Sequence, residues 1–227
     1  KSNAKGIPVI TATQMLLSMT QNERATRAEI SDVANAVLDG TDVVMLSEES
    51  AVGEDPINVV DTMHNIIAKT EGIYNYDKQY EMPYLDEFDV IQATVTKLAD
   101  DLKANGILAI TSSGKSALKM SRYRPRTPIF TFTHKKKVLN SLTAIWGVEP
   151  IGTIKEAQAS KMFQKMLKSL DEIGKLKKDG LYVATVGYPV GMPGSTNTIK
   201  ILTPSEIEYY FNFEENRKKE KEEKKSK

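Results

Sequence analysis

The sequence predicts an α/β protein in two parts, an incomplete strand–helix segment followed by a three-layer α/β/α domain. First, apolar, β-rich runs alternate with stretches of helical periodicity, which is typical of parallel sheets. Second, only two such runs precede residue 73, and two strands do not make an independently stable parallel sheet. Third, roughly 120 residues follow with about five strands and flanking helices, which is enough for a domain with its own core.

In the first part, apolar runs at residues 7–13 and 42–47 predict two buried strands. Thr26 and Glu29 have the spacing of a capping box, and Gly40 stands where a helix would end, so a helix is expected between them. Asp55-Pro56 predicts the start of another helix, because proline is favoured in the first turn. One or two helical turns are expected over residues 14–20.

The boundaries follow from changes in composition and periodicity. They predict incomplete strand–helix units over 1–72, a linker over 73–87, an α/β domain over 88–210 and a charged tail over 211–227. In the α/β domain, strands are expected at 106–111, 128–133, 148–151, 181–186 and 198–202. Helices are expected over 89–104, 115–122, 135–146 and 155–173. The mixed charges of the tail predict a solvated or frayed helix, with a binding arm as the alternative.

Composition excludes several classes of protein. The 227 residues include 31 Lys and Arg against 30 Asp and Glu, a formal net charge of +1, so we expect neither nucleic acid nor a membrane surface as partner. No apolar run approaches the roughly 20 residues of a membrane span. The absence of cysteine excludes disulfides and thiolate metal sites and fits a cytoplasmic location. His64 and His134 lie far apart, which argues against a metal-dependent hydrolase.

The most specific local pattern is the turn Thr111-Ser112-Ser113-Gly114-Lys115-Ser116, between a strand and a helix. The free N–H groups and the dipole of a helix N-terminus favour an anion, and Lys115 adds positive charge. The turn is not a nucleotide-binding P-loop, because Ala109 stands where that motif needs glycine. Two interpretations stay open: a phosphate site, or hydroxyl side chains that only cap the helix.

A glycine-rich loop follows the strand at 181–186. Gly187, Gly191 and Gly194 alternate there with Pro189 and Pro193, which allows close approach of backbone to a ligand or simply turns the chain. Ligands of such sheets gather beyond the carboxyl ends of the strands. Because this loop and the Ser/Thr turn both follow strands, we expect them to share one edge of the sheet.

Thr13 and Ser47 end the two early strands, so in a barrel both hydroxyls would face its catalytic mouth. The alternative is local hydrogen bonding. Arg24 and Arg27 flank a helix start, where a cation gains nothing from the dipole. This favours a partner surface over two solvated arginines. The acidic stretch 48–55 is expected to be a solvated loop rather than a metal site.

Several stretches together resemble the pyruvate kinase family. In the first part they are Pro8 to Leu16, Thr26 to Glu29, Ser31 to Asp42 and Met45-Leu46-Ser47. In the second part they are Thr111 to Ala117, Arg122-Tyr123-Arg124-Pro125 and Gly194 to Ile199. The resemblance extends to about Leu202. It implies that the chain carries the last two units of a (β/α)8 barrel, followed by the regulatory C-terminal domain of a longer protein.

The resemblance also implies a function. The parent enzyme would transfer a phosphoryl group from phosphoenolpyruvate to ADP, giving pyruvate and ATP in glycolysis, with Mg²⁺ and K⁺ held by residues outside this chain. The chain alone is then expected to be inactive. The alternative is an effector-binding or oligomerisation module without catalysis.

Residue roles follow from the same resemblance. Thr13 would bind substrate and deliver the proton that turns enolpyruvate into pyruvate. A phosphorylated effector would bind Thr111, Ser112, Ser113, Gly114, Lys115 and Ser116 together with the opposite loop, Gly191, Gly194, Ser195 and Thr196. Arg27 would lie near a subunit contact of a homotetramer. No metal ligand is expected within this chain.

Overall fold

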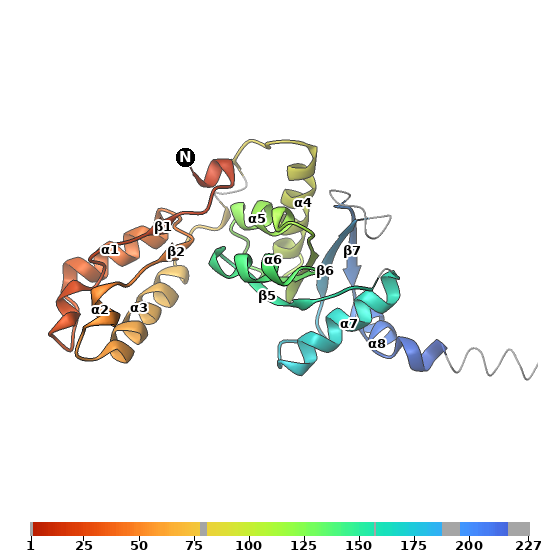
Figure 1. The fold of residues 1–227 in the computed structure, drawn as a ribbon. Coiled ribbons are helices and arrows are strands. Elements are labelled where there is room, and N and C mark those ends of the chain that lie inside the picture. Colours follow the sequence, from red (N-terminus) through yellow and green to blue (C-terminus); the bar gives the residue numbers. More distant parts are fainter. Residues whose placement is uncertain (1, 78–80, 157, 188–195, 218–227) are drawn as a thin grey trace, which may run out of the picture. The chain divides into compact units, whose positions relative to one another are not determined.

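The computed structural model describes residues 2–77, 81–156, 158–187 and 196–217 (Figure 1). The chain divides into two compact units. The N-terminal unit contains residues 1–78 with 144–146, and the C-terminal unit contains 79–143 with 147–227. Each unit is an α/β structure with parallel strand pairing. None of the described helices combines the length and the apolar character that crossing a membrane requires.

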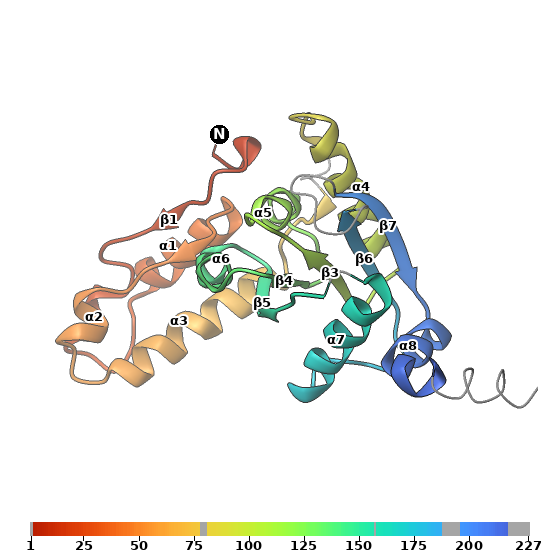
Figure 2. The ribbon, with the colours of Figure 1, turned by 45° about the vertical axis from the view of Figure 1, so that its right-hand side comes forward.

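The N-terminal unit is built on two short parallel strands, β1 (Ile10–Thr11) and β2 (Val43–Val44), with Ile10 opposite Val43. The helices α1 (Arg27–Leu38) and α3 (Pro56–Glu71) pack against each other (Figure 2). Three short helices complete the unit: η1 (Asn3–Lys5), η2 (Leu17–Thr20) and α2 (Glu48–Ala51). The core consists of Met15, Leu16, Met19, Val33, Val59 and Met63.

The expectation that these strands are buried is wrong for this chain. Ile7 is 53% exposed and Ile10 is 57% exposed. A sheet of two strands leaves apolar side chains and backbone groups without neighbours to cover them. For the same reason β1 and β2 are shorter than the strands that the apolar runs predicted. The predicted caps are confirmed: Thr26 and Glu29 form the reciprocal capping box of α1, and Gly40 follows that helix with φ +90°.

The C-terminal unit contains a five-stranded sheet in the order β5-β4-β3-β6-β7. The strands are β3 (Gly106–Ile110), β4 (Ile129–Thr133), β5 (Val148–Thr153), β6 (Tyr182–Gly187) and β7 (Thr196–Leu202). The first four run parallel, and β7 joins β6 in antiparallel orientation. All five strands correspond to segments that the apolar runs predicted.

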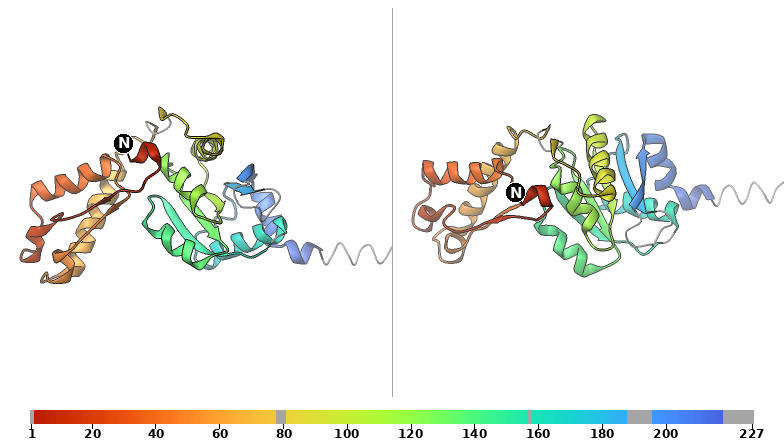
Figure 3. Two further views of the ribbon diagram at one scale, coloured as in Figure 1. Left: turned by 45° about the horizontal axis from the view of Figure 1, so that its top comes forward. Right: turned by 90° about the horizontal axis from the view of Figure 1, so that it is seen from above.

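Helices cover both faces of this sheet, so the unit has the predicted three layers (Figure 2). One layer contains α4 (Glu87–Asp101), α5 (Lys115–Arg122) and α6 (Lys136–Ser141), which continues as η4 (Leu142–Ala144). The other contains α7 (Ala159–Glu172) and α8 (Pro204–Phe211). Two further views show the same helix layers on the two faces of the five-stranded sheet (Figure 3).

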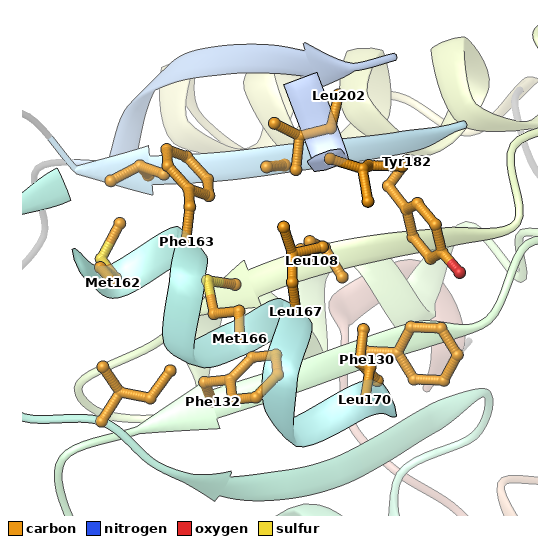
Figure 4. Packing of buried hydrophobic residues seen from close by; sticks show 14 residues of the cluster. Leu108, Phe130, Phe132, Met162, Phe163, Met166, Leu167, Leu170, Tyr182 and Leu202 are labelled. Carbon is orange, nitrogen blue, oxygen red and sulfur yellow. The ribbon is translucent and has the colours of Figure 1, made fainter. Parts of the chain in front are cut away.

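The main core lies between the sheet and α7 (Figure 4). Met166, Leu167 and Leu170 of α7 lie beside Leu108, Phe130 and Phe132 of strands β3 and β4. All six side chains are buried. Burial of such side chains stabilises the fold by about 1.5–3 kcal/mol each.

Helix α8 was not predicted as a separate element. A second capping box starts it, formed by Thr203 and Glu206, with Pro204 in the first turn. Ile207 is buried in the core beside α7, and the Gln164 side chain donates a hydrogen bond to the Phe211 carbonyl. The helix is short and has one buried apolar anchor within it, so the sequence periodicity was too weak to reveal it.

Candidate functional site

The turn Thr111–Ser116 lies at the carboxyl end of the central strand β3 and leads into α5. Strand β6 pairs with β3 on one side, while the chain proceeds from β3 through α5 to β4 on the other side. The turn is therefore at the topological switch point of the sheet, where ligands of open α/β domains bind.

The turn has a defined internal hydrogen bond. The backbone N–H of Gly114 donates to Thr111 Oγ1 over 2.9 Å, and Thr111 is buried. Gly114 is the residue that precedes α5, and its φ of +87° is a conformation that glycine adopts without strain. No side chain caps α5. The Thr111 hydroxyl therefore serves the residue just before α5, whereas Ser112 and Ser113 do not cap the helix.

The side chains at the mouth of the turn differ in environment. Within the described part of the chain, the hydroxyl groups of Ser112 and Ser113 have no hydrogen-bond partner. Lys115 is exposed at the first position of α5. Ser116 is buried, and its Oγ lies 3.4 Å from Thr196 Oγ1 at the start of β7. The start of β7 and the Ser/Thr turn are therefore adjacent in the folded domain.

The remaining residues of the glycine loop, Gly191, Gly194 and Ser195, lie outside the described residues. Of that predicted half of the site, only Thr196 is placed. The predicted convergence of the two loops at one edge is supported at this one position.

The far end of α5 is anchored by buried charges that the sequence interpretation did not single out. Arg122 Nη1 donates to Asp89 Oδ2 over 2.7 Å, and both side chains have no exposed surface. Tyr123 Oη donates to the same oxygen over 2.8 Å. Burial and this hydrogen bond hold the pKa of Tyr123 well above its ordinary value. The sequence Arg122-Tyr123-Arg124-Pro125 could have indicated this contact. An arginine that becomes buried where a helix ends needs a partner for its charge.

In the N-terminal unit, Thr13 follows β1 and is exposed. Its φ is +73°, and the φ of Gln14 is +53°. A positive φ is unusual for any residue with a side chain and is a clear outlier for a β-branched one. Ser47 follows β2, which is the neighbouring strand. Both hydroxyl-bearing residues thus lie at the carboxyl ends of adjacent parallel strands.

The expectation of a solvated acidic loop at 48–55 is wrong for Glu49, which is 1% exposed. Its Oε2 accepts a hydrogen bond from the Ser47 N–H over 2.8 Å, and its Oε1 accepts one from the Leu16 N–H over 3.2 Å. Burial by itself raises the pKa of Glu49, but these N–H donors outweigh it, so the pKa lies below the ordinary value. The described residues contain no group of three or more His, Asp or Glu that could hold a metal ion.

Glu29 forms a similar contact nearer the start of α1. It accepts hydrogen bonds from both the N–H and the hydroxyl of Ser18, over 2.7 Å and 2.5 Å, in addition to its capping-box contacts with Thr26. Arg27 is exposed at the first position of α1. The segment after β1 is therefore held by hydrogen bonds to two carboxylates, those of Glu49 and Glu29.

The fold defines a class of protein: an open α/β domain with a Ser/Thr turn at its switch point, preceded by two parallel strand–helix units. Family models agree with this class. The pyruvate kinase α/β domain matches residues 89–202, and the pyruvate kinase barrel domain matches residues 1–60. The chain belongs to the pyruvate kinase family.

Relatives and a solved structure are consistent with this assignment. The chain is 42% identical over 207 residues to a pyruvate kinase of Lactobacillus delbrueckii subsp. bulgaricus, covering 88% of this chain and 35% of that protein. It is 42% identical over 205 residues to the Clostridium acetobutylicum pyruvate kinase, covering 88% and 43%. A crystal structure of a Cryptosporidium parvum pyruvate kinase matches with a TM-score of 0.79 and 33% identity, covering 89% of this chain and 41% of that one. The chain thus spans less than half the length of these proteins.

Proposed function

We propose that this chain is the C-terminal portion of a cytoplasmic glycolytic pyruvate kinase, which transfers a phosphoryl group from phosphoenolpyruvate to ADP and forms pyruvate and ATP. The observation that supports this most directly is the pair of family matches, barrel first and α/β domain second, over most of the chain. Phosphoryl transfer depends on positioning and on neutralising charge with metal ions. Mg²⁺ and K⁺ would supply that neutralisation.

The described residues do not fit a metal site, since their carboxylates and histidines form no cluster. The metal ligands of the proposed enzyme would therefore lie outside the described residues. The chain's own contribution would be Thr13. Its hydroxyl would bind substrate and pass a proton through water to the methylene carbon of enolpyruvate, which becomes the methyl group of pyruvate.

The proposal is tested by assaying this chain with phosphoenolpyruvate, ADP, Mg²⁺ and K⁺. We expect no turnover above background, because only two strands of the barrel are present. The longer polypeptide that contains the chain serves as the positive control. Turnover by the chain alone would contradict the proposal that it is a portion, and an inactive longer polypeptide would contradict the proposed reaction.

We also propose an allosteric site for a phosphorylated metabolite at Thr111, Ser112, Ser113, Gly114, Lys115 and Ser116, with Gly191, Gly194, Ser195 and Thr196 opposite. The unpartnered hydroxyls of Ser112 and Ser113 and the exposed Lys115 support it among the described residues. The free N–H groups at the start of α5 add donors for an anion. This effector-binding function is also the second candidate, as a module without catalysis.

Calorimetric titration of the chain with phosphosugars and AMP tests this site. We expect binding of at least one compound, and we expect Lys115→Ala to weaken it by removing a charge that contacts phosphate. Lys69→Ala is the matched control, because Lys69 is an exposed lysine of the other unit. Absence of binding, or equal binding by Lys115→Ala and the unsubstituted chain, would contradict the proposal.

An oligomer-building role is a separate proposal, in which Arg27 contributes to the interface of a homotetramer. Its support is that Arg27 is exposed at a helix start, where its charge is unfavourable to the helix. Sedimentation of the longer polypeptide should show a tetramer that Arg27→Ala weakens. A tetramer that responds to no phosphorylated ligand would favour a purely architectural C-terminal domain.

A further inference from the structure

Glu49 connects the two chain segments that follow the neighbouring strands β1 and β2. One carboxylate oxygen accepts a hydrogen bond from the Leu16 N–H, in the segment that follows β1. The other accepts one from the Ser47 N–H, three residues after the end of β2. The Ser47 contact alone would be a local hydrogen bond at the start of the short helix α2. The Leu16 contact is long-range, because it joins Glu49 to a segment 33 residues away in sequence.

The segment that Glu49 fastens contains unusual backbone. Thr13 and Gln14 both have positive φ, three and two residues before Leu16. Each such residue costs about 1–2 kcal/mol compared with ordinary backbone, unless the surroundings hold it. The buried contact between Glu49 and Leu16 is a restraint close enough in sequence to hold these two residues in place.

The chemistry of the contact requires a carboxylate. Each of the two N–H donors contacts a different oxygen of Glu49, and a glutamine in the same position would place its NH₂ group, a donor, against one of them. An aspartate is one methylene shorter and cannot keep both distances. Glu49 lies almost fully buried, so a lost contact would not be replaced freely by water.

We propose that Glu49 is a positioning residue that holds Thr13 at the site of proton delivery by joining the ends of β1 and β2. This inference rests on the proposed function of Thr13. Glu49 itself would not touch substrate. Its effect would be on the proton step, because displacement of a reacting group by about 1 Å can lower a rate by about 100-fold.

The experiment compares Glu49→Gln with Glu48→Gln in the longer polypeptide. Glu48 is the adjacent carboxylate, is exposed and has no side-chain hydrogen bond among the described residues. Two rates are measured: pyruvate formation from phosphoenolpyruvate, and exchange of the pyruvate methyl hydrogens in D₂O by NMR. The exchange reports the proton step without phosphoryl transfer. Melting temperature is recorded for each variant.

We expect Glu49→Gln to slow methyl exchange by roughly 10- to 100-fold, with a smaller change in KM for phosphoenolpyruvate, and Glu48→Gln to match the unsubstituted enzyme. A folded Glu49→Gln variant with an unchanged rate of methyl exchange would overturn the inference. The proposed function is judged separately, by whether the unsubstituted enzyme has pyruvate kinase activity. If Glu49→Gln does not fold, Glu49→Asp is assayed with the same expectation. If neither folds, hydrogen exchange of the unsubstituted enzyme decides: fast exchange of the Leu16 and Ser47 amides overturns the inference, and slow exchange supports it.

Discussion

Arg122 and Asp89 form an ion pair with no solvent-exposed side-chain surface, with 2.7 Å between Arg122 Nη1 and Asp89 Oδ2. The pair joins the last turn of α5 to the first turn of α4. Arg122 Nη2 also donates to the Pro83 carbonyl over 2.7 Å, and the Leu85 N–H donates to Asp89 Oδ2 over 2.9 Å. The chain segment before α4 is thus held on the C-terminal unit by the same two side chains.

Asp89→Asn should destabilise the C-terminal unit by about 3–5 kcal/mol, because it leaves the Arg122 charge buried without its carboxylate. Urea unfolding followed by far-UV circular dichroism measures the change in the free energy of unfolding. Asp101→Asn is the matched control: Asp101 pairs with Lys97 on the exposed surface of the same helix, so its loss should cost at most about 0.5 kcal/mol. Equal effects of the two substitutions would contradict the importance of the buried pair.

Gly106→Ala should destabilise the C-terminal unit by about 1–3 kcal/mol through overpacking. A Cβ at this position would lie 2.4 Å from Phe130 Cε2 and 3.2 Å from Tyr182 Cδ1, in the interior between neighbouring strands. The measurement is the midpoint of thermal or urea unfolding. For comparison, Gly152→Ala should be close to neutral, since a Cβ there meets nothing within 4 Å. A neutral Gly106→Ala would show that Phe130 can shift without cost.

Lys103→Gly should stabilise the C-terminal unit by about 0.5–1 kcal/mol. Lys103 follows α4 with φ +51°, and the next residue, Ala104, donates to the Ala99 carbonyl over 2.9 Å, so the helix ends in a left-handed turn. Glycine adopts this conformation without the steric cost of a Cβ. Lys97→Gly, in the interior of the same helix, should instead destabilise by about 1 kcal/mol. The same unfolding assay compares them, and a loss of stability in Lys103→Gly would refute this account.

Attachment of α8 should weaken in acid. The Lys200 ammonium donates a hydrogen bond to Glu206 and holds the pKa of Glu206 below its ordinary value of 4.5. The contact therefore contributes fully above pH 4.5 and is lost as the pH falls through the lowered pKa. The protection factors of the α8 amides, which are corrected for the intrinsic pH dependence of hydrogen exchange, should fall over that range.

Lys200→Met tests the cause of this pH dependence. It should reduce the change in α8 protection factors between neutral pH and pH below 4.5. Lys165→Met, which removes the exposed pair with Glu156, should leave that change unaltered. Because the same contact raises the pKa of Lys200, no corresponding loss is expected on the basic side until the pH exceeds about 10.5. Equal α8 protection factors at both pH values in the unsubstituted chain would contradict the prediction.

Features that depend on a few consecutive residues could be predicted from the sequence. The capping box of Thr26 and Glu29, the proline start of α3 and the five apolar strands of the C-terminal sheet were all readable, because caps and periodicity act over one to three turns. The Ser/Thr turn was likewise visible as a strand-to-helix junction.

Which polar groups are buried, and what they contact, depends on how distant parts of the chain pack together. Glu49 was indistinguishable in sequence from its exposed neighbour Glu48, and the Arg122–Asp89 pair joins residues 33 positions apart. Burial and hydrogen bonding between distant segments depend on how the helices and strands pack, and no local pattern records that packing. The same reason explains the exposed Ile10: its apolar side chain predicted burial, but burial requires a neighbouring element to cover it.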